Sequence, residues 1–180
     1  MKYLTQHELE ALIEEIPVSW QKLMVKVAFL HGCRVSEVIG LTTKNIQDGY
    51  LTIKRLKGSQ KTTQPLQKDG KGLFNEAVEL NALVLTLTPG DRLFPMTRFG
   101  AYKLLKRAGK RAGIPEHKLF PHALKHSIAM QTIHSAGIEN VRQWLGHRSI
   151  ASTGAYLKVS DDEAAKAIGT ALHVAGEAKR

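Results

Sequence analysis

Two histidines and a lysine lie close together at residues 122–126 (HALKH). Pro121 precedes them, which is typical of a helix start, and helical periodicity then places His122, Lys125 and His126 along one face. Such donors on the first turn of a helix can bind an anion, and the positive helix terminus strengthens the attraction. The alternative interpretation is a solvated basic face. Zinc fits less well, because the acid between the histidines of a zinc hydrolase motif is missing and no suitable third ligand follows.

Three further clusters contain groups suited to phosphate or proton chemistry. A glycine stop places His147 where it can point into a cleft, and Tyr156 follows nine residues later. Arg34 begins a predicted helix just after Gly32 and Cys33, and Glu37 lies one turn further on. Lys57 lies in a predicted hairpin turn. Taken singly, they have ordinary alternatives: a half-packed tyrosine, a surface ion pair and a solvent-exposed lysine.

Helical spacing of apolar residues covers most of the chain that must position these clusters. The first helix starts at a capping box formed by Thr5 and Glu8 and ends before Pro17. Glycines stand where helix C-caps are expected, at positions 113, 137 and 146. The predicted helices cover residues 5–16, 19–30, 35–39, 74–87, 97–112, 122–136, 138–145, 149–156 and 161–175.

One segment changes to a period of two. Residues 50–54 (YLTIK) alternate after an Asp48-Gly49 turn, and a second run covers residues 62–66. Pro65 predicts that the last strand lies on a sheet edge. We therefore expect an α+β fold, mostly an α-helical bundle with a small antiparallel hairpin or three-stranded sheet, forming a single domain over residues 1–180.

The composition of the 180-residue chain, with 43% hydrophobic residues and one cysteine, predicts one globular core. It excludes a disordered tail, a collagen-like chain and a disulfide scaffold. The lone Cys33 indicates a reducing compartment. No stretch has the pattern of a membrane span or signal peptide, so the sequence predicts a cytoplasmic protein that does not enter a membrane.

Positive charge is concentrated in one part of the chain. The formal net charge is +10, and residues 92–158 contain 12 Lys and Arg against 2 acids. Residues 44–71 add 7 basic residues against 2 acids. This imbalance favours a polyanion as partner, the alternative being a surface that is merely well solvated.

The four clusters together resemble, in this order, the catalytic domain of the tyrosine recombinase (phage integrase) family. The first arginine box of the family resembles GCRVSEV at 32–38, and its hairpin lysine resembles Lys57 in LKGSQK. Its His-x-x-Arg-His box resembles 122–126, and its third box resembles LGHRS at 145–149, with Tyr156 following as the nucleophile. The successive intervals from Arg34 to Tyr156 are 23, 65, 25 and 9 residues, so the resemblance covers nearly the whole chain.

The resemblance implies the role of each catalytic residue. Tyr156 would attack the scissile phosphate and form a 3′-phosphotyrosyl link, which stores the bond and needs neither a nucleotide nor another cofactor. Arg34 and Lys125 would hold the nonbridging oxygens. The implied catalytic set is Arg34, Lys57, His122, Lys125, His147 and Tyr156.

Proton transfer would fall to three members of this set. Lys57 would protonate the leaving 5′-oxygen, His147 would donate to the phosphate and His122 would assist at the nucleophile. These side chains would replace the divalent metals of other nucleases, so no metal is expected.

The sequence departs from the family pattern in two places. Lys125 stands where the family has its second arginine, which replaces a planar fork by a compact ammonium. The N-terminal DNA-clamping domain usual in the family is absent from these 180 residues. The alternative functions are a DNA-binding regulator or catalytically impaired relative, marked by Lys125, and a ribonuclease-like His/Lys enzyme, which would not need Tyr156.

Duplex DNA is the implied partner. Phosphate-contacting residues are predicted at Lys54, Lys61, Lys103, Lys106, Arg107, Lys110 and Arg148. The apolar stripe of the predicted helix 161–175 resembles the family element that packs into a neighbouring protomer, which implies a homo-oligomer, a tetramer on DNA. Such a protein would be associated with the nucleoid.

Overall fold

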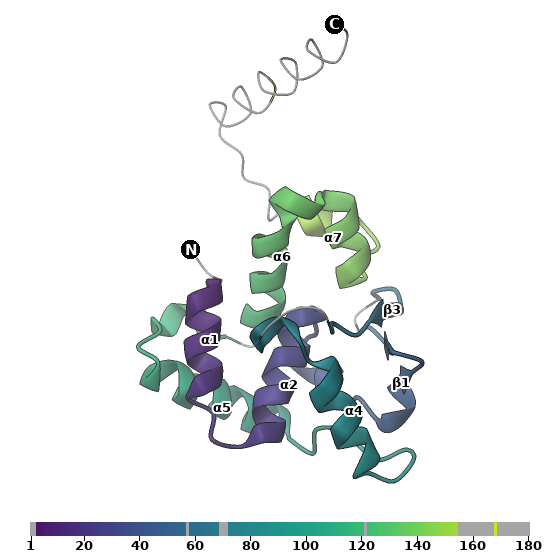
Figure 1. Cartoon of the computed structure of the whole chain (residues 1–180). Coiled ribbons are helices and arrows are strands. Elements are labelled where there is room, and N and C mark those ends of the chain that lie inside the picture. Colours follow the sequence, from purple (N-terminus) through teal and green to yellow (C-terminus); the bar gives the residue numbers. More distant parts are fainter. Residues whose placement is uncertain (1–2, 57, 69–71, 121, 155–167, 169–180) are drawn as a thin grey trace, which may run out of the picture.

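The computed structural model describes residues 3–56, 58–68, 72–120, 122–154 and 168 (Figure 1). Its α-helices are α1 (Gln6–Glu14), α2 (Ser19–Leu30), α3 (Val35–Val38), α4 (Ala77–Leu85), α5 (Arg98–Arg111), α6 (Ala123–Ala136), α7 (Ile138–Leu145) and α8 (Ala151–Gly154). Strands β1 (Ile46–Gln47), β2 (Tyr50–Ile53) and β3 (Thr62–Pro65) form one sheet. Single 3₁₀ turns are η1 (Thr43–Asn45), η2 (Gly72–Phe74) and η3 (Glu116–Lys118). The predicted α+β class is confirmed.

Helix α2 is the centre of the core. Its residues from Leu23 to Leu30 are all buried, and it contacts α1, α3, α4 and α6 (Figure 1). Lys26 is tolerated there because its ammonium pairs with the Glu79 carboxylate and donates to the Asn75 carbonyl at 3.3 Å. The buried part of α2, residues 23–30, leads directly into the segment that carries Arg34.

The sheet is antiparallel, with the order β1-β2-β3. Asp48 and Gly49 both have positive φ, 50° and 78°, as a two-residue type I′ turn requires. Leu51 and Ile53 point inward and are fully buried. Pro65 lies in an edge strand, as predicted.

Two predicted helices differ from the structure. The helix expected over 74–87 is a 3₁₀ turn followed by α4, because the N–H groups of Glu76 and Ala77 both donate to the Gln67 carbonyl, at 3.2 and 3.1 Å. The helix expected from 122 starts at Ala123, with His122 as its N-cap.

The end of the chain is described only in part. Of the helix expected over 149–156, residues 149–154 are described, and the helix there begins at Ala151 as α8 and not at Ser149. The predicted helix 161–175 lies outside the described residues, apart from the exposed Ile168. Among the described residues, no helix is long and apolar enough to cross a membrane.

Candidate active site

A cavity of about 390 Å³ brings together residues from three of the predicted clusters. Its lining consists of Arg34, Gly58, Ser59, His122, Lys125, His126, His147, Arg148, Ser149 and Ser152. No acidic side chain is among these described lining residues. Four of the six predicted catalytic residues therefore face one cationic space. Lys57 and Tyr156 lie outside the described residues.

Arg34 is held in place by the short helix that it begins. It is the N-cap of α3, and the Glu37 carboxylate accepts bonds from its backbone N–H at 2.9 Å and from Nη1 at 2.7 Å. Nη1 also donates to the Leu56 carbonyl at 3.2 Å. The side chain is 18% exposed. All its side-chain bonds to described residues involve Nη1, so Nε and Nη2 make no bond to a described residue and can serve as donors to a phosphate.

The buried Glu37 carboxylate accepts hydrogen bonds from Arg34, Arg55 and Leu56. Burial alone would raise its pKa, but the N–H groups of Leu56 and Arg34 and the charge of Lys125 outweigh burial and lower it. The group is therefore ionised at neutral pH. The predicted pair of Arg34 and Glu37 exists, but it is not the ordinary surface pair that the sequence left as an alternative, because the carboxylate is inaccessible.

Lys125 is buried in the first turn of α6, with only 4% of its surface exposed. Its Nζ donates to the Leu145 carbonyl at 2.9 Å, which connects α6 to the end of α7. Burial, followed by the charges of Arg55 and Arg34, lowers its pKa to about 7, although Glu37 acts in the opposite direction. A solvated basic face is therefore the wrong interpretation for Lys125.

The two histidines of this cluster differ in exposure. His122 is exposed at the rim, and His126 is half-buried with its ring 5.6 Å from that of Phe120. Burial, then His122 and Lys125, lower the pKa of His126. At neutral pH the His126 imidazole is therefore in its neutral form. The adjacent Lys125 ammonium has its pKa close to neutral pH.

His147 follows the left-handed Gly146 that ends α7. Its Nδ1 hydrogen-bonds with the Thr153 hydroxyl of α8 at 3.0 Å, and the residue is 8% exposed. Burial, then Lys125 and Arg34, lower its pKa to about 4. The imidazole is thus neutral at pH 7 and can act as a hydrogen-bond donor without adding charge.

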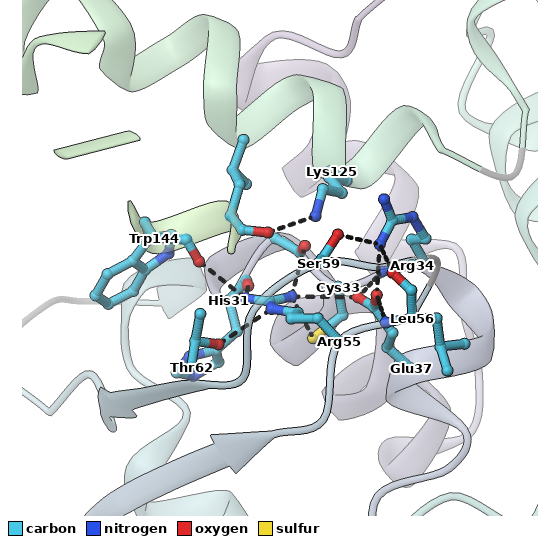
Figure 2. A network of polar contacts seen from close by, with 12 residues as sticks. His31, Cys33, Arg34, Glu37, Arg55, Leu56, Ser59, Thr62, Lys125 and Trp144 are labelled. Carbon is cyan, nitrogen blue, oxygen red and sulfur yellow. Dashed lines mark hydrogen bonds and ion pairs between the residues drawn. The ribbon is translucent and has the colours of Figure 1, made fainter. Parts of the chain in front are cut away.

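Arg55 is the residue that the sequence analysis missed. It follows β2, is buried, and its guanidinium bonds to segments from three parts of the chain (Figure 2). A signal was present: Leu51, Ile53 and Arg55 share one side of the alternating strand, and the first two are core residues.

The residues predicted to bind DNA lie on several surfaces. Lys103, Arg107 and Lys110 are exposed on α5, and Lys106 pairs with Glu116 at 2.8 Å. Arg148 lines the cavity, whereas Lys54 and Lys61 are exposed at the two ends of the loop between β2 and β3. Their contacts with DNA stay predictions. Within the described residues, no group of three or more potential metal-ligating side chains occurs.

Comparison with known sequences supplies the family. Residues 2–163 match the phage integrase family. The tyrosine recombinase XerA of Pyrococcus furiosus is 30% identical over 171 residues, covering 88% of this chain and 58% of the relative. The tyrosine recombinase XerD of Halalkalibacterium halodurans is 31% identical over 177 residues, with the same two shares. The chain thus spans about 58% of the length of these relatives.

Solved structures share the fold. The XerH site-specific recombinase bound to its difH substrate superposes with a TM-score of 0.72 at 22% identity, over 93% of this chain and 54% of that one. The catalytic domain of bacteriophage HP1 integrase gives a TM-score of 0.68 at 23% identity, over 94% of both chains. With the family match over most of its length and the shared fold, this chain belongs to the phage integrase family.

Proposed function

We propose that this chain is the catalytic domain of a site-specific DNA recombinase that cuts and rejoins strands through a 3′-phosphotyrosine at Tyr156. The observation that carries the proposal is the convergence of Arg34, His122, Lys125 and His147 on one cavity. These residues come from α3, α6 and the segment after α7, so they meet only in the fold. The names of the XerA and XerD relatives support the same activity.

In the proposed reaction the Tyr156 oxygen forms a bond to phosphorus, and the bond from phosphorus to the 5′-oxygen breaks. His122 would take up the phenolic proton and Lys57 would protonate the leaving 5′-oxygen. The 5′-hydroxyl of a second strand then attacks the phosphotyrosine, which restores a phosphodiester and releases the tyrosine. Arg34 and Lys125 would stabilise the negative charge that develops on the nonbridging oxygens, with His147 as a neutral donor.

A nicked suicide substrate tests the activity directly. The 5′-hydroxyl fragment diffuses away after cleavage, so the covalent complex accumulates and is seen on a denaturing gel. Tyr156→Phe should abolish the adduct while the affinity for duplex DNA stays within about twofold, because every cation remains. DNA binding without any adduct in the unaltered protein would instead support the DNA-binding regulator. An adduct formed by Tyr156→Phe would refute the nucleophile assignment.

The variant Lys125→Arg tests whether the lysine is suited to catalysis in this site or reduces the cleavage rate. A planar fork can keep a bond to the Leu145 carbonyl and direct a second N–H at the phosphate, so we expect the cleavage rate to rise by about 10²-fold. The rate is measured in single turnover on the nicked substrate. An unchanged or lower rate would mean that the cavity is built around an ammonium.

We also propose that several copies of the protein assemble on DNA. We expect the segment 161–175 to join protomers into a tetramer on a recombination site in the nucleoid. Native mass spectrometry of the chain with and without the residues after 160, each bound to a duplex, should show tetramers only for the full chain. Equal stoichiometry for the two would contradict this.

A further inference from the structure

All three guanidinium nitrogens of Arg55 donate hydrogen bonds to other groups of the same chain. Nε donates to the Thr62 hydroxyl at 3.0 Å, Nη1 to the Gly32 carbonyl at 2.9 Å and to the Glu37 carboxylate at 3.2 Å. Nη2 donates to the carbonyls of residues 31 and 144, at 2.7 and 2.9 Å. Its side chain has no exposed surface, and it is not among the residues that line the cavity. Arg55 therefore does not reach a ligand in that cavity.

The partners of Arg55 belong to two segments that carry different residues of the cavity lining (Figure 2). To one segment belong the end of α2 and Glu37, the carboxylate that fixes Arg34. To the other belongs the Trp144 carbonyl in the last turn of α7. The next residue, Leu145, accepts the Lys125 bond, and His147 follows after Gly146. One side chain thus joins the segment that carries Arg34 to the segment that orients Lys125 and His147.

We propose that Arg55 is a positioning residue for strand cleavage, which sets the separation between Arg34 and the pair of Lys125 and His147 so that all three engage one phosphate. The inference rests on the proposed function for its effect on rate, but its geometry stands on the contacts alone.

The contacts that surround Arg55 require a planar fork. Carbonyls that come from different directions, a hydroxyl and a carboxylate accept bonds from all three nitrogens. Lysine would keep the charge but offers three donors on one nitrogen, so it cannot hold both segments. A shift of about 1 Å between catalytic groups can cost about 10²-fold in rate.

The charge of Arg55 gives a second, independent readout. Lys125 is faced by Arg34, Arg55, Cys33 and Glu37, and after burial the Arg55 charge is the largest influence that lowers its pKa. Removing that charge should raise the pKa of Lys125, and replacing it with lysine should leave the pKa low. Loss of stability alone does not predict this pattern.

The test compares Arg55→Lys, Arg55→Met and Thr62→Val with Leu80→Ala. Leu80 is a fully buried residue of α4 that does not line the cavity, so its variant controls for stability. All are assayed where each is folded, for single-turnover adduct formation and for affinity to a nicked duplex. Lys125 is titrated separately by NMR of protein labelled with ¹³C at the lysine Cε.

We expect Arg55→Lys to lower the cleavage rate about 100-fold with DNA affinity within threefold and with the Lys125 titration unmoved. Arg55→Met should lower the rate at least as much and shift the Lys125 titration to higher pH. Thr62→Val, which removes one bond only, should lower the rate about threefold to tenfold, so a variant remains if both Arg55 substitutions unfold the protein. Leu80→Ala should change neither readout.

The inference would be overturned if Arg55→Lys cleaved at the original rate, or if Arg55→Met left the Lys125 titration unmoved. A rate loss in Leu80→Ala equal to that in the Arg55 variants would also overturn it, since stability would then explain both. If the unaltered protein forms no adduct, the proposed function fails, and the Lys125 titration alone still decides whether Arg55 acts on this cavity.

Discussion

The molecule carries positive charge in two places that differ in nearly every physical respect. Around the cavity, Arg55 and Lys125 are buried, and their donors bond to backbone carbonyls and to Glu37. On α5, by contrast, Lys103 and Lys110 project into solvent. The Lys103 ammonium lies 4.3 Å from the centroid of the neighbouring Phe99 ring and has no buried partner among the described residues.

This contrast shows that net charge has two separate uses in one small fold. A buried cation loses hydration and persists only when each donor is satisfied, so its position is fixed and it can determine geometry. An exposed cation keeps its water and moves freely, so it contributes attraction that salt screens. A count of basic residues cannot distinguish the two.

Removing a buried countercharge gives the largest predicted effect. Glu37→Gln leaves Arg34 and Arg55 without their carboxylate, and we expect the free energy of unfolding at pH 7 to fall by about 3 kcal/mol or more. The matched change on the exposed side is Glu116→Gln, which removes the partner of Lys106 and should not measurably alter the urea midpoint. Equal shifts in the two midpoints would erase the distinction between the regions.

Two glycines with nearly the same positive φ separate the effect of packing from the effect of backbone strain. Gly146 and Gly113 have φ of 68° and 69°, but a Cβ on Gly146 would lie 2.6 Å from the Gln60 carbonyl oxygen, whereas one on Gly113 would meet nothing within 4 Å. Gly113→Ala should cost about 1 kcal/mol for the left-handed conformation. Gly146→Ala should cost about 2 to 4 kcal/mol, because the loop between β2 and β3 that contains Gln60 must also move. Urea denaturation of both variants measures the difference, and a difference below about 0.5 kcal/mol would argue against close packing at the cavity.

The buried lysine also predicts a pH dependence of stability. The pKa of Lys125 is about 7 in the folded protein instead of 10.5, so the unfolded chain binds more protons between these values and stability should rise with pH. Cys33, with its pKa raised to about 11, opposes this above pH 9. Between pH 7 and 9 we expect a gain of about 1 to 2 kcal/mol that Lys125→Met abolishes. An identical pH profile for the variant would contradict burial of the ammonium.

The smallest effects belong to the exposed helix. Lys103→Ala, Arg107→Ala and Lys110→Ala should each weaken binding to any duplex by about threefold to tenfold and reduce the slope of log K against log salt by about 0.9. The control is Arg111→Ala, since Arg111 is engaged by Glu15 of the segment after α1. Fluorescence anisotropy over a salt series gives both quantities. A sequence-dependent loss would show that these residues contact bases.

Local patterns carried much of the architecture. The capping box at Thr5, the turn at Asp48 and Gly49, and the edge position of Pro65 each depend on neighbours in sequence, and the structure has all three. Helical spacing groups His122 with Lys125, but only resemblance to a family adds Arg34 and His147 to them. The fold then places all four at one cavity.

The polar network beneath the cavity could not be predicted in the same way. His31 hydrogen-bonds with Gln64 at 2.7 Å and with Glu76 at 2.9 Å, partners 33 and 45 residues away. No local pattern links such residues, because only the docking of α4 and β3 on α2 brings them together. Arg55 was overlooked for a different reason: in sequence it stands between Lys54 and Lys57, and a basic residue in such a run suggests a solvated surface.

The position of the chain's only cysteine gives this protein a built-in chemical probe. Cys33 is buried with its sulfur 3.8 Å from Arg55 Nη1, and burial raises its pKa to about 11. A thiol reagent can therefore react only in molecules in which the end of α2 and the end of α7, which Arg55 joins, have transiently separated. The alkylation rate of the native protein, divided by that of the unfolded chain, reports how often this separation occurs. DNA that binds to both of these segments should slow the alkylation in proportion to how firmly it holds them together.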